Sequence, residues 1–279
     1  MSNVEGTAST EYGHSRKHVL QYSMDGITTQ FYATHLTFKN TPSTRTLTLM
    51  LCHGLAMNPE MYFPTIKYLR GLLTGSDISI GAVWLLEHAN HGDSGVLNED
   101  IIQQHFKNSF PLTRYGTAIV TFLDSGFVDH RDPNFVAIAH CGGSGGLSIE
   151  RIFAGVEKRA KKGYLKRATH WSDVEEAMRY HRDKHPWDTW DPEVLELMKL
   201  SVFRREQSGK IGLKTTIEQE SACFEYKYSL HAGELLASFV DRVPVHIIMA
   251  ERWDQCAIAL DNALRAEFSP ENRKITARL

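Results

Sequence analysis

The chain has 279 residues, of which 42% are apolar and 23% are charged, values close to those of average globular proteins. Its formal net charge of −2 gives no reason to expect nucleic acid or an anionic membrane surface as a partner, and no apolar run reaches the roughly 20 residues needed to span a bilayer. The four cysteines, Cys52, Cys141, Cys223 and Cys256, show no CxxC spacing, so we expect no metal site, no disulfide framework and no cofactor.

The first half of the chain predicts strands that alternate with helices. The N-terminal MSNVEGTAST has no charged and then apolar signal region, which indicates an intracellular, reducing compartment. Residues 17–39 contain two strand-like stretches around a turn at Asp25 and Gly26, and residues 45–54 read as a buried strand, RTLTLMLCHG. A helix is expected around 61–73, another buried strand leads into HGDS at 91–94, and a second helix is expected around 111–124. This alternation predicts a three-layer α/β arrangement.

The segment 134–146, NFVAIAHCGGSGG, is the strongest candidate for a catalytic turn. A run of β-formers leads directly into glycines that surround one thiol and one hydroxyl, as expected for a strained turn that presents a nucleophile at the edge of a sheet. If the strand runs to His140, the nucleophile is Cys141; a later turn would make it Ser144, within a literal GxSxG. We favour Cys141, because the apolar run ends directly before it. The alternative is a glycine-rich turn that binds a phosphate or nothing.

The second half of the chain changes character and then returns to strand-like sequence. The basic segment KRAKKGYLKR precedes a helical region that contains Trp171, Trp187 and Trp190, which we expect to form a lid core or the wall of an acyl pocket. The segment PVHIIMA at 244–250 resumes the sheet, residues 256–268 have the periodicity of an amphipathic helix, and KITARL reads as a last strand. We therefore expect a core in residues 1–155, a helical lid insertion in 156–240, and the last part of the core in 241–279.

Together these motifs resemble the α/β-hydrolase superfamily. Its members carry an HG pair after the third strand, a G-H-G-x-S-like turn after the fourth, and the nucleophile turn after the fifth, and here HG, HGDS and the Cys141 turn follow in that order. The segments HGLAMNPEMYFPTIKYL, HANHGDSGVLNED and HPWDTWDPEVLELM are similar to a fungal branch that includes a yeast peroxisomal lipase and hydrolases of Alternaria host-selective toxin clusters. The similarity covers most of residues 15–255.

The resemblance implies roles for several residues. The backbone N–H groups of Leu55 and Gly142 would form the oxyanion hole, and Asp254, in the loop after PVHIIMA, would be the triad acid. Asp254 could equally be the N-cap of the helix that follows. The superfamily places its histidine after the acid, yet no histidine follows His246, so either the chain ends one motif early or another histidine has taken the role.

His53 and His91 are weak candidates for that base, because they lie on loops at the same sheet edge, although a structural role is the stronger expectation for each. The region after the nucleophile is also short: only GGSGGLSIERIFAG separates Cys141 from the basic segment. We therefore expect an α/β-hydrolase-like fold: a mostly parallel sheet with helices on both faces and a helical lid insertion. The helix after the nucleophile turn and the C-terminus are expected to be shortened. A thiol partly compensates for a missing base, since it ionises far more readily than a serine hydroxyl.

The final residues Ala277, Arg278 and Leu279 fit the small-basic-Leu form of the peroxisomal import tripeptide, so an import receptor is an expected partner. The resemblance implies a carboxylic ester or thioester hydrolase that acts on a fatty-acid-derived intermediate in toxin biosynthesis, within the peroxisome. Two alternatives stay open: a relative that has lost catalysis and serves as a binding or scaffold protein, and an acyltransferase on the same scaffold. A nucleotide-binding protein ranks last, because no acidic residue follows the glycine-rich turn at the expected place.

Overall fold

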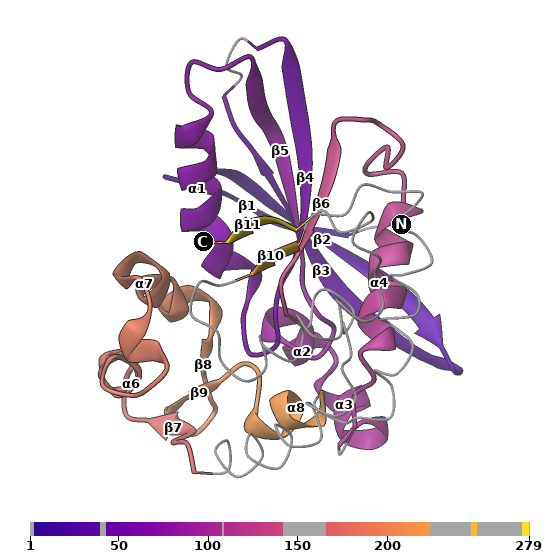
Figure 1. The fold of residues 1–279 in the computed structure, drawn as a ribbon. Helices are drawn as coiled ribbons and strands as arrows, with labels where there is room; N and C mark the ends of the chain where they lie inside the picture. The colour runs from indigo at the N-terminus through magenta and orange to yellow at the C-terminus, as the bar shows by residue number, and fades with distance from the viewer. Residues whose placement is uncertain are drawn as a thin grey trace.

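The computed structural model describes residues 3–39, 43–107, 109–141, 166–223, 247–249 and 275–278. Within these ranges, a six-stranded sheet forms the centre of the molecule, and a cap built from residues 166–223 lies at one end of it (Figure 1). None of the described helices is long and apolar enough to cross a membrane.

The six-stranded sheet has the order β1-β2-β3-β5-β4-β6. Its first half is an antiparallel meander of β1 (Asn3–Thr10), β2 (Gly13–Met24) and β3 (Ile27–Thr37). Asp25 and Gly26 join β2 to β3 with φ values of 54° and 74°, the backbone of a tight hairpin turn, as the sequence predicts. The second half is parallel: β4 (Arg45–Cys52) lies between β5 (Ile78–Leu86) and β6 (Phe135–Ala139).

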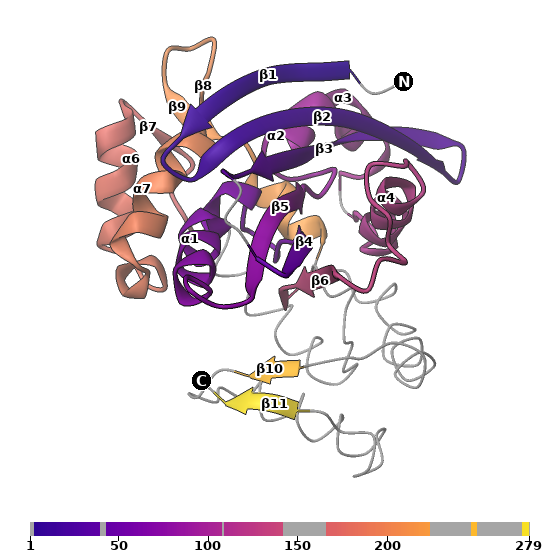
Figure 2. The ribbon, with the colours of Figure 1, turned by 90° about the horizontal axis from the view of Figure 1, so that it is seen from above.

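Parallel strands need crossover connections, and here helices provide them. The chain passes from β4 to β5 through η1 (Pro59–Tyr62) and α1 (Phe63–Leu72), and from β5 to β6 through α2 (Gly92–Leu97), α3 (Glu99–His105) and α4 (Thr113–Leu123). Figure 2 shows α1 and α4 on opposite faces of the sheet. The predicted helices around 61–73 and 111–124 are α1 and α4, whereas the sequence reading did not anticipate α2 and α3.

Alternate residues of the central strands build two separate cores. In β4, Leu49 and Leu51 pack with Phe63 and Ile66 from α1. The intervening Met50 and Cys52 belong to the other cluster, which holds Tyr115, Ala118 and Phe122 from α4. Because successive side chains of a strand point to opposite faces, a strand covered by helices on both sides must be apolar throughout. This explains why RTLTLMLC reads as a continuous apolar run rather than an alternating one.

The cap contains helices and a small sheet. Its helices are α6 (Val174–Arg182), η3 (Trp187–Thr189), α7 (Pro192–Ser201) and α8 (Ile217–Ala222). The strands β7 (His170–Trp171), β9 (Ile211–Leu213) and β8 (Phe203–Arg205) form a three-stranded antiparallel sheet in that order. Trp171, Met178, Met198 and Phe203 are buried in a cluster of their own, into which Met61 of η1 reaches from the core. The lid expected in 156–240 is thus a mixed helix-and-strand cap over the residues that the structure describes.

The last two described strands pair with each other. β10 (Ile247–Met249) and β11 (Ile275–Arg278) are parallel, and Figure 2 shows them beyond β6, outside the six-stranded sheet. Both strands fall where the sequence predicts them, in PVHIIMA and KITARL. Among the described residues, however, β10 pairs with β11 and does not resume the six-stranded sheet as predicted. Ala277 and Arg278 of the proposed import tripeptide pair with Ile248 and Met249, while Leu279 and the predicted helix at 256–268 lie outside the described residues.

Candidate active site

The strand-to-turn junction at Cys141 has the backbone conformation expected of a nucleophile elbow. The His140 N–H donates to the Cys52 carbonyl at 3.0 Å, so pairing with β4 continues one residue beyond β6. The next residue, Cys141, has φ = 51°, in the left-handed region that residues with a Cβ rarely adopt. Such a strained position is often a functional one. The turn therefore begins at Cys141, and this favours the thiol over Ser144, which lies outside the described residues together with Gly142 and Asp254.

The loop after β4 uses nearly all of its backbone donors. The N–H groups of His53 and Gly54 donate to the hydroxyls of Tyr115 and Tyr62 at 3.1 and 3.2 Å. The Ala56 N–H donates to His91 Nε2 at 3.1 Å, and the Met57 N–H donates to the Gly54 carbonyl at 3.2 Å.

Among the described residues of this loop, Leu55 and Asn58 have N–H groups without a hydrogen-bond partner, and Leu55 is the one that follows Gly54 directly. Leu55 is also the residue whose amide the resemblance to α/β-hydrolases assigns to an oxyanion hole. Since backbone donors are normally paired, this one is left available for a ligand oxygen.

Gly54 lies directly against the elbow. A Cβ added to it would lie 2.9 Å from His140 Nδ1 and 3.1 Å from Cys141 Cβ, closer than side chains tolerate. The missing side chain thus allows the loop and the turn to approach each other. Glycine in the HG motif is explained by this contact, because the loop that carries the Leu55 amide meets the thiol-bearing turn at Gly54.

His53 and His91 both use their two ring nitrogens within the protein. His53 Nε2 accepts from the His88 N–H at 2.9 Å, so its Nδ1–H donates to the Gly54 carbonyl at 2.8 Å. His91 Nε2 accepts from Ala56, and its Nδ1 donates to Asn90 Oδ1 at 2.7 Å.

Burial lowers the pKa of His53 to about 4 and lowers that of His91 as well, so both rings are neutral at pH 7. The geometry favours the structural role for each: they hold the loops around the site, and the lone pair of each ring is already occupied.

His88, His91 and Cys223 form a buried group that resembles a metal-ligand set. One potential ligand atom from each lies within 4.8 Å of the others. However, the His91 lone pair is used by Ala56, and the Cys223 sulfur accepts from Asn90 Nδ2 at 3.1 Å. Burial raises the pKa of Cys223 to about 12, so its sulfur remains a protonated thiol rather than the thiolate that a metal requires. These contacts fit a hydrogen-bonded packing cluster better than a metal centre.

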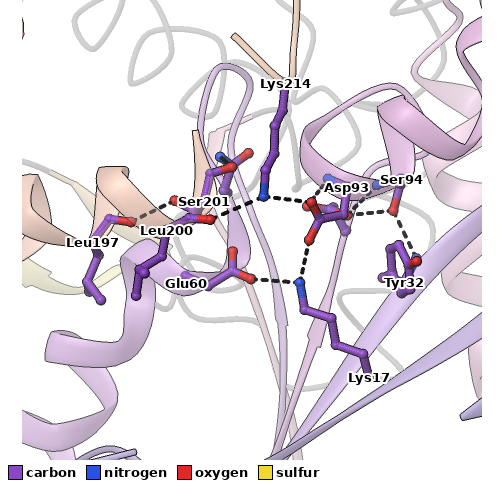
Figure 3. Close-up of polar contacts among 11 residues, drawn as sticks. Lys17, Tyr32, Glu60, Asp93, Ser94, Leu197, Leu200, Ser201 and Lys214 are labelled. Atoms are coloured by element: carbon purple, nitrogen blue, oxygen red, sulfur yellow. Dashed lines mark hydrogen bonds and ion pairs between the residues drawn. The ribbon is translucent and has the colours of Figure 1, made fainter. Parts of the chain in front are cut away.

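The HGDS turn connects the core to the cap through ion pairs (Figure 3). Asp93 in α2 binds Lys17 of β2 and Lys214 of the cap, each at 2.6 Å. Lys17 also binds Glu60 at 3.1 Å, and Lys214 donates to the Leu200 carbonyl at 3.1 Å. Burial alone would raise the pKa of Asp93, but the two lysines outweigh it and lower the pKa. We call Lys17, Glu60, Asp93 and Lys214 the cap clamp.

Ser94 of the same turn is buried and structural. Its hydroxyl donates to Glu87 Oε2 at 2.6 Å and accepts from the Tyr32 N–H at 2.9 Å. Burial raises the pKa of Glu87 to about 8, with the nearby Glu60 carboxylate adding to the shift and Lys17 opposing it. Gly92 has φ = 52°, and a Cβ there would lie 1.9 Å from Glu87 Oε1, so this glycine is required both by the backbone and by the carboxylate beneath it.

A cavity lies between the loop after β4 and the cap. Ala56 and Met61 line it from the core, and Trp187, Met198 and the partly buried Arg167–Glu220 ion pair line it from the cap. The tryptophans expected to form a lid core or a pocket wall do both: Trp171 is buried in the cap, whereas Trp187 faces this cavity.

Several residues of the site gave no local signal in the sequence. Tyr62 and Tyr115 receive the first two amides of the loop, and both come from helices on either side of the sheet. Glu87 and the cap clamp likewise join segments far apart in the chain. Such contacts depend on tertiary packing and follow no short motif.

No family model and no curated protein matches this sequence. Solved structures do. A peroxisomal α/β-hydrolase from Saccharomyces cerevisiae superposes with a TM-score of 0.64 at 15% identity, over 90% of this chain and 79% of its own. The thioesterase domain of a curacin biosynthetic pathway gives 0.54 at 10% identity, over 90% of each chain, and a Mycobacterium tuberculosis esterase gives 0.51 at 12%, over 88% and 80%. With the strand order and the turn at Cys141, these similarities show that the chain has the α/β-hydrolase fold.

Proposed function

We propose that this protein is a hydrolase of carboxylic esters or thioesters, with Cys141 as nucleophile. The observation that carries the proposal is the meeting of two backbone features at Gly54: the left-handed turn at Cys141 and the loop whose Leu55 amide has no partner among the described residues. A thiol beside an unused N–H donor is the minimum arrangement for attack on a carbonyl carbon with stabilisation of the resulting oxyanion. The hydrolase, thioesterase and esterase names of the structural neighbours support the same reaction class.

In this proposal the substrate carbonyl oxygen accepts from the amides of Leu55 and Gly142. The Cys141 sulfur bonds to the carbonyl carbon, the oxyanion collapses, and the alcohol or thiol leaves with a proton. Water then attacks the acyl-cysteine and releases the acid. Asp254 is proposed to orient the general base, as the resemblance implies.

The proposed substrates are fatty-acid-derived esters or thioesters. The apolar side chains of Met61, Trp187 and Met198, which form part of the wall of the cavity beside Ala56, would contact an acyl group there. The resemblance to the toxin-cluster branch supports a role in secondary metabolism, and the C-terminal tripeptide supports the peroxisome, where the yeast neighbour is also described. An N-terminal fluorescent fusion, with and without Ala277–Leu279, tests the proposed peroxisomal localisation. Loss of the punctate signal on deletion supports it, and a punctate signal that persists contradicts it.

The reaction is tested by covalent trapping together with turnover. The purified protein is incubated with acyl-CoA thioesters and p-nitrophenyl esters of several chain lengths, and acyl adducts are mapped by mass spectrometry after acid quenching. We expect an acyl group on Cys141, and loss of both adduct and turnover in Cys141→Ala. Ser144→Ala is the matched control and should retain both.

Other outcomes separate the alternatives. An adduct on Ser144 with full activity of Cys141→Ala would overturn the assignment of Cys141 as the nucleophile. An acyl-cysteine that is released only when an acceptor alcohol is added would indicate an acyltransferase. Acyl ligands that bind without any adduct or turnover would refute the hydrolase and indicate a binding protein.

A further inference from the structure

The identity of the general base is the open step in the proposed reaction. No histidine follows His246 in the sequence, and the lone pairs of His53 and His91 are already occupied by backbone N–H groups. A histidine directly beside Cys141 is better placed than either of them.

His140 and Cys141 lie on the same side of the turn. Along a regular strand, consecutive side chains point to opposite faces. Here the left-handed backbone of Cys141 changes that direction: the His140 ring and the Cys141 Cβ both lie close to the single point where a Gly54 Cβ would be. The ring and the thiol-bearing carbon are therefore neighbours across the Gly54 gap.

The Tyr62 hydroxyl contacts the Nδ1 atom of the His140 ring. Its hydroxyl oxygen accepts from the Gly54 N–H at 3.2 Å, lies 2.8 Å from His140 Nδ1, and lies 3.7 Å from Met57 Sδ. The hydroxyl has one proton, and sulfur in methionine can only accept. All three contacts are satisfied together when Tyr62 donates to Met57 and accepts from both Gly54 and His140 Nδ1–H. The lone pair of the imidazole is then on Nε2.

We propose that His140 is the general base for Cys141, and that Tyr62 is a positioning residue that holds its imidazole in the Nε2-basic tautomer. The inference rests on the proposed function. The Cys141 Sγ–H proton passes to His140 Nε2 as sulfur bonds to the carbonyl carbon. The resulting imidazolium gives that proton to the departing thiolate or alkoxide, and the same nitrogen takes a proton from the water that hydrolyses the acyl-enzyme. Sγ recovers a proton when the acid leaves.

The surroundings of His140 fit this role. Burial lowers its pKa, so the ring is neutral and can accept a proton at pH 7. The titratable groups around it are Tyr62, whose pKa burial raises, His53, whose pKa burial lowers, and Cys141 itself. Tyr62 and His53 are uncharged near neutrality, so neither holds a charge that would oppose proton transfer.

The test measures the thiol directly and does not depend on knowing the substrate. The rate of Cys141 alkylation by iodoacetamide is followed by mass spectrometry from pH 5.5 to 9 in the full-length protein. We expect His140→Gln to slow alkylation at pH 7 by about tenfold or more, and Tyr62→Phe by a smaller factor, with both effects shrinking towards pH 9 where hydroxide replaces the base. His105→Gln, on the exposed end of α3, is the matched control and should alkylate as the wild type does.

Folding is checked by circular dichroism and thermal unfolding, and Tyr62→Phe, which keeps the ring, serves if His140→Gln does not fold. Unchanged pH 7 rates in folded His140→Gln, or in Tyr62→Phe where it alone folds, overturn the inference. Wild-type thioester turnover reports separately on the proposed function: turnover with unchanged alkylation in the variants would retain the hydrolase and reject His140. Turnover that is lost in His246→Ala but kept in His140→Gln would assign the base elsewhere and also reject His140.

Discussion

Gly54→Ala tests the closest contact of the site, between the loop after β4 and the elbow. The new Cβ would lie 2.9 Å from His140 Nδ1 and 3.1 Å from Cys141 Cβ, whereas ordinary contact begins at 3.4 Å. Something must therefore move by about half an ångström, and neither neighbour moves easily. The His140 ring is held by Tyr62 at 2.8 Å, and Cys141 Cβ is fixed by a backbone that is already left-handed.

Overpacking of this kind costs about 1–3 kcal/mol of unfolding free energy, or a fall in Tm of roughly 2–8 °C for a chain of this size. The chemistry should suffer more than the stability. Since a misplacement of about 1 Å can cost 100-fold in rate, half that displacement predicts a loss of about tenfold in Cys141 alkylation and in kcat.

Urea unfolding and alkylation kinetics measure the two effects on the same samples. Gly71→Ala is the control, because Gly71 is exposed in α1 and a Cβ there meets nothing within 4 Å. It should leave the alkylation rate unchanged and increase stability by up to about 1 kcal/mol, the helix preference of alanine over glycine. A Gly54→Ala protein that matches the wild type in both measurements would show that the loop and the turn do not meet as described.

Three further predictions concern the polar groups beneath the site. Glu87→Gln should gain stability relative to the wild type as the pH rises. The pKa of the Glu87 carboxyl is raised to about 8 in the folded protein, so its contribution to stability is complete below the unfolded value of 4.5 and is lost between pH 4.5 and 8. In urea titrations at pH 5 and pH 8.5, the free energy of unfolding of the wild type should therefore fall, and that of the variant should not. Asp93→Asn should cost about 1–3 kcal/mol near pH 7, because it opens the cap clamp, and since the pKa of Asp93 is lowered, the difference should vanish as the pH falls below 3.8; an equal deficit at pH 7 and pH 3 would contradict the clamp. Tyr115→Phe should cost about 2–4 kcal/mol by thermal unfolding, because its buried hydroxyl donates to the Leu86 carbonyl and accepts from the His53 N–H; a loss below about 0.5 kcal/mol would refute that pairing.

The sheet and its crossovers could be read from the sequence because their signals are local. RTLTLMLC, the Asp25–Gly26 turn and the apolar run before His140 each specify an element within ten or so residues, and the structure has a strand or turn at each. The left-handed turn has a local signal as well: the apolar run ends at Ala139, and the left-handed residue Cys141 follows two positions later.

The roles of the histidines could not be predicted in the same way. The sequence motifs place His53 and His91 at the sheet edge, but tertiary packing determines which N–H groups donate to their ring nitrogens. Strand alternation alone would make His140 point away from Cys141, and the turn at Cys141 is what changes that geometry. The strands of the cap were missed because β7, β8 and β9 are two or three residues long, too short for a periodic pattern.

The bond from the Ala56 N–H to His91 Nε2 has a consequence for sequence variation. It joins the histidine of the His91–Gly92 motif to the backbone of the loop that follows His53–Gly54, so positions 56 and 91 should vary as a pair in any library that randomises both. Ala56 has φ = 60°, and its contribution is an amide rather than a methyl group. Selection should therefore accept glycine or asparagine at position 56 and reject proline, which has no N–H to offer, and β-branched residues, which strain that backbone. At position 91, selection should accept only side chains that place a hydrogen-bond acceptor where His91 Nε2 lies.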